Sequence, residues 1–148
     1  MSDRPAYQFV DTNVLVYAHD ASAGFKHERA LTLIKSLWET QAGCLSIQVL
    51  EEFYVALIRK VARPLASEAA AQIVTDLAAW RVHAPEVDDV LDAITIHQRY
   101  SISFWDGLVV QSAARLGCQS IWSEDLNPGQ LYAGVRLINP FESLSGRE

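Results

Sequence analysis

The segment Tyr7-Gln8-Phe9-Val10-Asp11-Thr12-Asn13 decides the fold class, because a short β-forming run, Tyr7 to Val10, ends in a polar turn. Apolar residues at helical spacing follow over 25–40. The same order returns where a second short run, Cys44 to Ile47, leads into a helix that Ser46 can cap. A strand, a helix and another strand predict a right-handed crossover between parallel strands.

The rest of the chain continues this alternation. The further predicted helices cover 46–62, which ends before Arg63-Pro64, then 67–80, 86–100 and 103–116, which Gly117 terminates. The further predicted strands are 82–84, 118–122 and 135–138. The pattern predicts an α/β fold with a central parallel β-sheet of about five short strands, flanked by helices on both faces.

Bulk features of the 148 residues favour one continuous domain over 1–148, because we find no internal repeat, low-complexity tract or linker. The start lacks a signal-peptide pattern and no apolar run is long enough to span a membrane, so we expect a cytoplasmic protein that makes no membrane contact. Cys44 and Cys118 stand apart from each other and from the scattered histidines, which predicts two buried reduced thiols rather than a zinc site.

Four acids fall where a parallel sheet binds its ligands, outside the carboxyl ends of the strands. Asp11 follows the first predicted strand and Asp125 follows the strand over 118–122. Asp106 and Glu52 lie in the first turns of helices that follow strands, and such helix N-termini face the same edge. We therefore expect the four carboxylates to converge.

Clustered carboxylates repel one another, and a divalent cation relieves the repulsion. Oxygen-only ligands favour Mg²⁺ or Mn²⁺ over zinc. One or two such ions activate water for phosphodiester hydrolysis. The net charge of −6 argues against a broad basic surface, but setting aside the four acids leaves 14 acids against 12 bases.

Each acid also has a purely structural interpretation. Asp106 lies three residues after the helix cap Ser103, where a carboxylate complements the helix dipole. Asp11 can close a strand with an Asx-turn, and Asp125 lies in an ordinary turn sequence. Glu52 lies nearly opposite the predicted apolar stripe of its helix, which favours a solvated residue. The stripe consists of Ile47, Leu50, Tyr54, Leu57, Ile58 and Val61.

Four segments together resemble PIN-domain nucleases, particularly VapC-type toxins, and the ending Asn139-Pro140-Phe141 fits the same subgroup. The similarity runs from about Tyr7 to Phe141, in the order typical of the family. The segments are Val10-Asp11-Thr12-Asn13-Val14-Leu15-Val16-Tyr17, Leu45-Ser46-Ile47-Gln48-Val49-Leu50-Glu51-Glu52-Phe53-Tyr54, Ser103-Phe104-Trp105-Asp106-Gly107-Leu108 and Trp122-Ser123-Glu124-Asp125-Leu126-Asn127-Pro128-Gly129-Gln130.

The resemblance implies that Asp11 and Asp106 are the principal metal ligands, with Glu52 and Asp125 completing the acidic site. It favours Glu52 over Glu51, because the acid of the family directly precedes the hydrophobic residue that Phe53 supplies here. The resemblance further assigns polar residues that orient the acids or metal-bound waters, and one additional acid at the rim. The polar residues are Thr12, Asn13 and Ser123, and the rim acid is Glu124.

The resemblance also implies an RNA endonuclease that a cognate antitoxin inhibits, since an arginine fork competes with the metal for carboxylates. A homodimer is expected as well, and it would cover apolar surface in a chain of which 50% is hydrophobic.

The surface that would face RNA is less distinct in the sequence. Arg59, Lys60 and Arg63 form a small basic group, which either contacts phosphates or complements a helix dipole. Trp105 neighbours Asp106, where base stacking is conceivable, but its helical apolar position favours the core or an interface, as for Trp38 and Trp80.

Three competing functions are weaker. A PIN-type RNA-processing nuclease without an antitoxin would have a similar sequence, but the small size and the segment 123–129 favour a toxin. A non-catalytic protein-binding module gives no reason for four acids at one sheet edge. Hydrolysis of a small phosphorylated substrate would need a Gly-rich or basic phosphate cradle, and we find none in the sequence.

Overall fold

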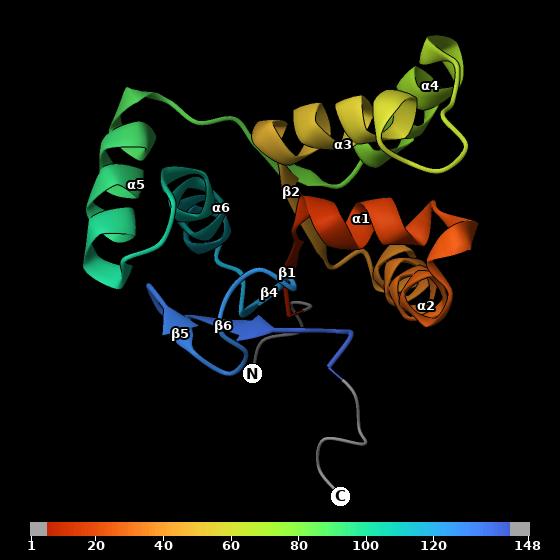
Figure 1. Cartoon of the computed structure of the whole chain (residues 1–148). Helices are drawn as coiled ribbons and strands as arrows, with labels where there is room; N and C mark the ends of the chain where they lie inside the picture. The colour runs from red at the N-terminus through yellow and green to blue at the C-terminus, as the bar shows by residue number, and fades with distance from the viewer. Residues whose placement is uncertain (1–5, 143–148) are drawn as a thin grey trace, which may run out of the picture.

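The computed structural model describes residues 6–142, and Figure 1 shows a central sheet with helices on both sides. Within that range the sheet has six strands in the order β3-β2-β1-β4-β6-β5. All neighbouring pairs are parallel except β5 with β6. The strands are β1 (Gln8–Val10), β2 (Gly43–Ser46), β3 (Arg81–His83), β4 (Ser120–Trp122), β5 (Leu131–Tyr132) and β6 (Val135–Ile138).

The helices cover both faces of this sheet, with α5 and α6 on one side and α1 to α4 on the other (Figure 1). The α-helices are α1 (Thr12–Ala18), α2 (Phe25–Thr40), α3 (Ile47–Arg59), α4 (Ser67–Leu77), α5 (Val87–Tyr100) and α6 (Phe104–Arg115), with a 3₁₀ turn η1 (Ala21–Ala23) after α1. The predicted α/β fold with a mainly parallel sheet is confirmed.

The order of the strands places a switch point between β1 and β4. From β1 the chain builds β2 and then β3 on one side, and it crosses back to add β4 on the other side of β1. In open α/β sheets ligands bind outside the carboxyl ends of the strands at such a point. Asp11 directly follows β1 and Ser123 directly follows β4, so both belong to this position.

The central strands are buried on both faces, as a parallel sheet requires. Phe9, Val10, Leu45 and Ile121 have no exposed surface, and they join the core that α2, α3 and α6 complete. Cys44 and Cys118 are free and buried, as predicted.

Two elements were absent from the sequence prediction. The prediction had a turn after Asp11 and the first helix at 25–40, whereas the chain forms α1 at once. Seven residues are too few for a clear helical period, and α1 is held by the burial of Val14, Leu15 and Ala18. The two-residue strand β5 was missed because its only partner is β6, across a tight turn with positive φ at Ala133 and Gly134.

Several predicted helices and strands were longer than the elements in the structure. The helix predicted over 46–62 ends at Arg59, the one predicted over 67–80 ends at Leu77, and the strand predicted over 118–122 begins at Ser120. Helix ends depend on cap geometry and local packing, which periodicity does not specify.

The apolar stripe predicted for α3 is partly wrong. Ile47 is 41% exposed, whereas Val49 and Phe53 are fully buried. The buried arc is set by three neighbours, α1, α4 and β2, so it is wider than a single stripe.

The three tryptophans predicted to lie in the core or at an interface differ in burial. Trp80 lies in the core, whereas Trp38 is 42% and Trp105 61% exposed, so for these two the core alternative is wrong and the interface alternative stays a prediction. Trp105 lies in the first turn of α6, beyond the region where that helix packs against the sheet.

Within the described range no helix combines the length and the apolar character that a membrane span needs.

Gly107 permits the close contact between α5 and α6. A Cβ at this position would lie 2.8 Å from the carbonyl oxygen of Ala93 and 2.9 Å from Cβ of His97. Both atoms belong to α5, and one is backbone, so the contact can be relieved only by moving the helices apart.

We therefore expect Gly107→Ala to destabilise the protein by about 1–3 kcal/mol. At an ordinary helix position a Gly→Ala change stabilises the protein by about 1 kcal/mol. The sign of the change in the free energy of unfolding therefore tests the packing. Urea denaturation measures the difference, with Ala114→Gly on the exposed side of α6 as the propensity control. A more stable Gly107→Ala protein would contradict the packing argument.

Candidate functional site

Asp11 occupies the junction between β1 and α1. Its backbone N–H extends the sheet by donating to the carbonyl oxygen of Trp122 at 2.9 Å. Its carboxylate caps α1, because Oδ1 accepts from the N–H of Thr12 at 2.8 Å, and Oδ2 accepts from the hydroxyl of Ser123 at 2.7 Å. Only 5% of the residue is exposed, so these contacts fix the carboxylate in place.

Asp125 is held beside Asp11 by two polar side chains. The backbone N–H of Asp125 donates to Oγ of Ser123 at 3.1 Å, and the side-chain amide of Asn13 donates to Oδ2 of Asp125 at 3.0 Å. Ser123 therefore contacts both acids. Thr12, Asn13 and Ser123 each donate a hydrogen bond to an acid, while the roles that the resemblance assigned to them stay a prediction.

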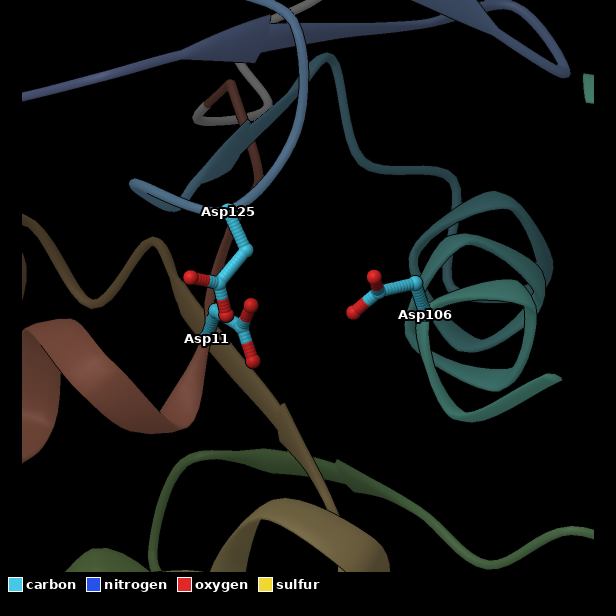
Figure 2. A group of neighbouring side chains, drawn as sticks. All are labelled: Asp11, Asp106 and Asp125. Atoms are coloured by element: carbon cyan, nitrogen blue, oxygen red, sulfur yellow. The ribbon is translucent and has the colours of Figure 1, made fainter. Parts of the chain in front are cut away.

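Asp106 approaches the other two acids from the opposite side. It lies in the first turn of α6, where its backbone N–H donates to the capping hydroxyl of Ser103 at 3.0 Å. Figure 2 shows its side chain pointing across towards Asp11 and Asp125, whose carboxylates lie next to each other. One oxygen from each of these three carboxylates lies within 4.8 Å of the other two.

Glu52 lines the same cavity as these acids but is not a member of the group of three. Its Oε1 accepts from the hydroxyl of Thr12 at 2.6 Å, and its Oε2 accepts from the side-chain amide of Gln48 at 3.2 Å. The side of α3 that periodicity assigned to solvent therefore faces the cavity. Glu51 is exposed and does not line it.

Glu124 is paired with groups outside the group of three acids. Its Oε1 accepts from the hydroxyl of Tyr17 at 2.7 Å, and its Oε2 forms an ion pair with Nζ of Lys26 at 2.9 Å. Glu124 therefore connects the loop that carries Asp125 to α1 and α2. Sequence reasoning missed Gln48, Tyr17 and Lys26, and only the four-residue spacing of Gln48 from Glu52 indicated one of them.

The surroundings disfavour negative charge on Asp11 and Asp106. Burial raises the pKa of Asp11 to about 7, against the hydrogen bonds from Ser123 and Thr12, which lower it. Repulsion from Asp125 and Asp106 raises this pKa further. The pKa of Asp106 is also raised, first by burial and then by Asp125 and Glu52. Such a site binds a cation favourably, because the cation removes the cost of ionising the acids.

The donor set fits a hard divalent cation. All three carboxylates offer oxygen, the ligand atom that Mg²⁺ and Mn²⁺ prefer. Oδ1 of Asn13 is buried beside them without a hydrogen-bond partner in the described structure, so it can accept from a water of the metal. The cavity in front has a volume of about 520 Å³, which leaves room for a substrate.

Comparisons with known proteins give a family and a shared fold. A family model described as PIN domain matches residues 8–132. No curated protein sequence matches the chain significantly.

Three solved structures share the fold. VapC20 of Mycobacterium tuberculosis, described as a sarcin-ricin loop cleaving toxin, has a TM-score of 0.59 and 22% identity over 80% of this chain and 89% of its own. A toxin-antitoxin complex from Klebsiella pneumoniae gives 0.68 and 15% identity, and FitAcB from Neisseria gonorrhoeae gives 0.65 and 15%. Each of these two matches covers 92% of this chain and 99% of the other.

The raised pKa of Asp11 makes stability depend on pH in the absence of metal. Its pKa is about 7 in the folded protein against an ordinary value of 3.8, so folding favours the protonated form. The wild type should therefore lose stability as pH rises from about 4 to 7 and then level off. Asp11→Asn lacks this loss, so we expect it to be the more stable protein at pH 8, by up to a few kcal/mol.

Urea denaturation in EDTA between about pH 5.5 and 8 measures this difference, which should shrink towards low pH. The matched control is Asp92→Asn, an exposed acid on α5. A constant difference between Asp11→Asn and wild type across this pH range would contradict the raised pKa.

Proposed function

The chain belongs to the PIN domain family, and on this basis we propose that it is a Mg²⁺-dependent endoribonuclease that hydrolyses RNA phosphodiester bonds, the toxin of a VapC-type toxin-antitoxin pair. The observation that carries the proposal is the convergence of Asp11, Asp106 and Asp125 at the switch point of the sheet. Mn²⁺ is expected to replace Mg²⁺, because both prefer oxygen ligands.

In this proposal Asp11, Asp106 and Asp125 hold the cation, and Glu52 completes the acidic site from α3. A bound divalent cation supplies acidified water and neutralises charge on the phosphodiester. Ser123 keeps Asp11 and Asp125 at a fixed separation, and Thr12 links Asp11 to Glu52. Asn13 fixes Asp125 through its amide and leaves its oxygen available to orient a water.

An antitoxin is the expected protein partner. The cavity is lined by five acids and by Lys60 as its single basic residue among the described residues. An arginine side chain pairs with carboxylates through two parallel hydrogen bonds, so a basic residue of a partner would compete with both metal and RNA. The lining acids are Asp11, Asp20, Glu52, Asp106 and Asp125.

A homodimer is the second expected assembly. On α5 four apolar residues recur at the spacing of one helical face, and all are exposed. An exposed apolar stripe of this kind indicates a contact surface. The residues are Val87, Val90, Leu91 and Ile94, with exposed fractions of 75%, 37%, 56% and 37%.

Cleavage of a pool of cellular RNAs tests the proposed activity. We expect cutting by the wild type with Mg²⁺ or Mn²⁺, none in EDTA, and a loss of at least about 100-fold in both Asp11→Asn and Asp106→Asn, since each removes a ligand charge. Asp92→Asn should cut like the wild type. Cutting that persists in both site variants, or in EDTA, would overturn the proposal.

Light scattering after size exclusion tests the dimer. The wild type should have twice the mass of the chain, and Leu91→Glu should shift it to the monomer, because a charge would be buried at the contact. Phe25→Glu places the same charge on an exposed apolar residue at the start of α2 and should remain dimeric. A monomeric wild type would contradict the dimer.

A further inference from the structure

We propose that single-stranded RNA lies along the groove between α1 and α3, with one base stacked on Trp105 and a backbone phosphate bound by Lys60. The inference rests on the proposed ribonuclease function and names residues that hold the substrate on either side of the acids. It changes the interpretation of Trp105 from a core or interface residue to a base-stacking platform.

The groove runs along α3, because residues on one face of this helix form one of its walls. Gln48, Glu52, Ala56 and Lys60 recur every four residues and all line the cavity, so one face of α3 forms its wall. Thr12, Asn13, Val16, Tyr17 and Asp20 of α1 and the turn after it form the facing wall. At 1.5 Å per residue the wall from Gln48 to Lys60 is about 18 Å long. A stacked strand advances about 3.4 Å per nucleotide, so this length suits a segment of about five nucleotides.

Trp105 stands at the Gln48 end of the groove. Its carbonyl oxygen accepts from the side-chain amide of Gln48 at 3.3 Å, and its ring also lines the cavity. Trp105 is 61% exposed, and its ring packs against that of Phe104 in a T-shaped arrangement, while the ring of Phe104 packs against His97. A large aromatic residue that a neighbouring ring holds in place and that is mostly exposed, next to an acidic site, has the properties of a base-stacking platform.

Gln48 adds a polar contact beside this ring. Its amide donates to Glu52 and to the carbonyl oxygen of Trp105, while its Oε1 is buried and has no partner in the described structure. A nucleobase amino group or a ribose 2′-hydroxyl can donate to this oxygen once the side chain of Gln48 rotates towards the cavity that it lines.

Lys60 stands at the opposite end of the same wall. It is exposed, and no carboxylate among residues 6–142 lies within ion-pair distance of its ammonium group. The distance along α3 exceeds the screening length of about 8 Å at physiological salt, so the acids near Glu52 do not neutralise Lys60. Asp20, which also lines the cavity, accepts hydrogen bonds from the N–H and hydroxyl of Ser22 and forms no ion pair with Lys60.

The groove continues beyond Lys60. A second cavity, of about 460 Å³, shares Asp20 and Val61 with the first and is also lined by Arg63. The basic residues at the end of α3 thus extend the path that starts at the acids. Because a base must leave its helical stack to reach Trp105, this path suits a single strand rather than a duplex.

Fluorescence anisotropy with a labelled, unstructured RNA of about 12 nucleotides tests the inference. Such an RNA is longer than the segment of about five nucleotides that the groove accommodates. Every protein carries Asp106→Asn and is measured in Mg²⁺, so that binding is read without cleavage. We expect Trp105→Ala to weaken binding by about 5- to 150-fold, the effect of losing one base stack, and Trp105→Phe to retain part of it. A duplex of the same sequence should bind more weakly than the single strand.

The salt dependence of RNA binding tests the role of Lys60 separately. Lys60→Ala should lower the slope of log affinity against log salt by about 0.7, the value for one phosphate contact with a single strand. Trp38→Ala and Lys35→Ala are the matched controls, since both residues are exposed and lie on α2, away from the groove. Neither control should change affinity or slope.

The outcomes separate the two proposals. Unchanged affinity in Trp105→Ala, or an unchanged salt slope in Lys60→Ala, would overturn the groove inference even if the wild type cuts RNA. Binding that depends on both residues in a protein whose wild type cuts no RNA would support the groove and contradict the nuclease. Equal affinity for duplex and single strand would also overturn the inference.

Discussion

The repulsion among three clustered carboxylates, of which Asp11 is the buried one, is the constraint on which the site depends. Asp11, Asp106 and Asp125 are held within 4.8 Å of one another, and burial raises the pKa of Asp11 to about 7. The fold keeps this arrangement through neutral donors, chiefly the hydroxyl of Ser123, and among residues 6–142 no basic side chain forms an ion pair with these three acids. A proton or a cation from outside the chain relieves the repulsion, and the proposed function assigns this role to a divalent cation.

The topology of the sheet explains how distant segments supply these acids. The chain reverses its direction of strand addition between β1 and β4, so the loops after both strands meet at one edge. The N-terminus of α6 then brings Asp106 from the other face of the sheet (Figures 1 and 2). Glu124, which the resemblance assigned to the rim, instead connects the Asp125 loop to Lys26 and Tyr17 and so stabilises its position.

The groove in front of the acids joins groups with different roles. Its walls are two helices that start at the same sheet edge, and α3 carries an amide, a carboxylate, a small residue and a cation on one face. In the proposed mode of RNA binding, this order separates the acidic metal site from the basic residue that attracts the substrate. The proposal thereby accounts for the binding of a polyanion by a protein with a net charge of −6 and without a broad basic surface.

The sequence by itself determined most of the longer elements and the acids at the sheet edge. The alternation of short apolar runs with helical periods predicted a parallel α/β sheet, and the positions of Asp11 and Asp125 after strands placed them at one edge. Capping predicted the start of α6, where Ser103 binds the N–H of Asp106. These features depend on local patterns of a few residues, which is why sequence reasoning reached them.

Only the tertiary structure decided which faces of those elements meet. Helical periodicity assigned Glu52 to solvent and Trp105 to the core or an interface, because a wheel compares residues within one helix and ignores what lies opposite. The packing of α1 beside α3 turns the polar side of α3 towards a cavity, and the position of α6 leaves Trp105 open at its end. The short helix α1 itself forms through burial of its apolar side, a contact that no local pattern encodes.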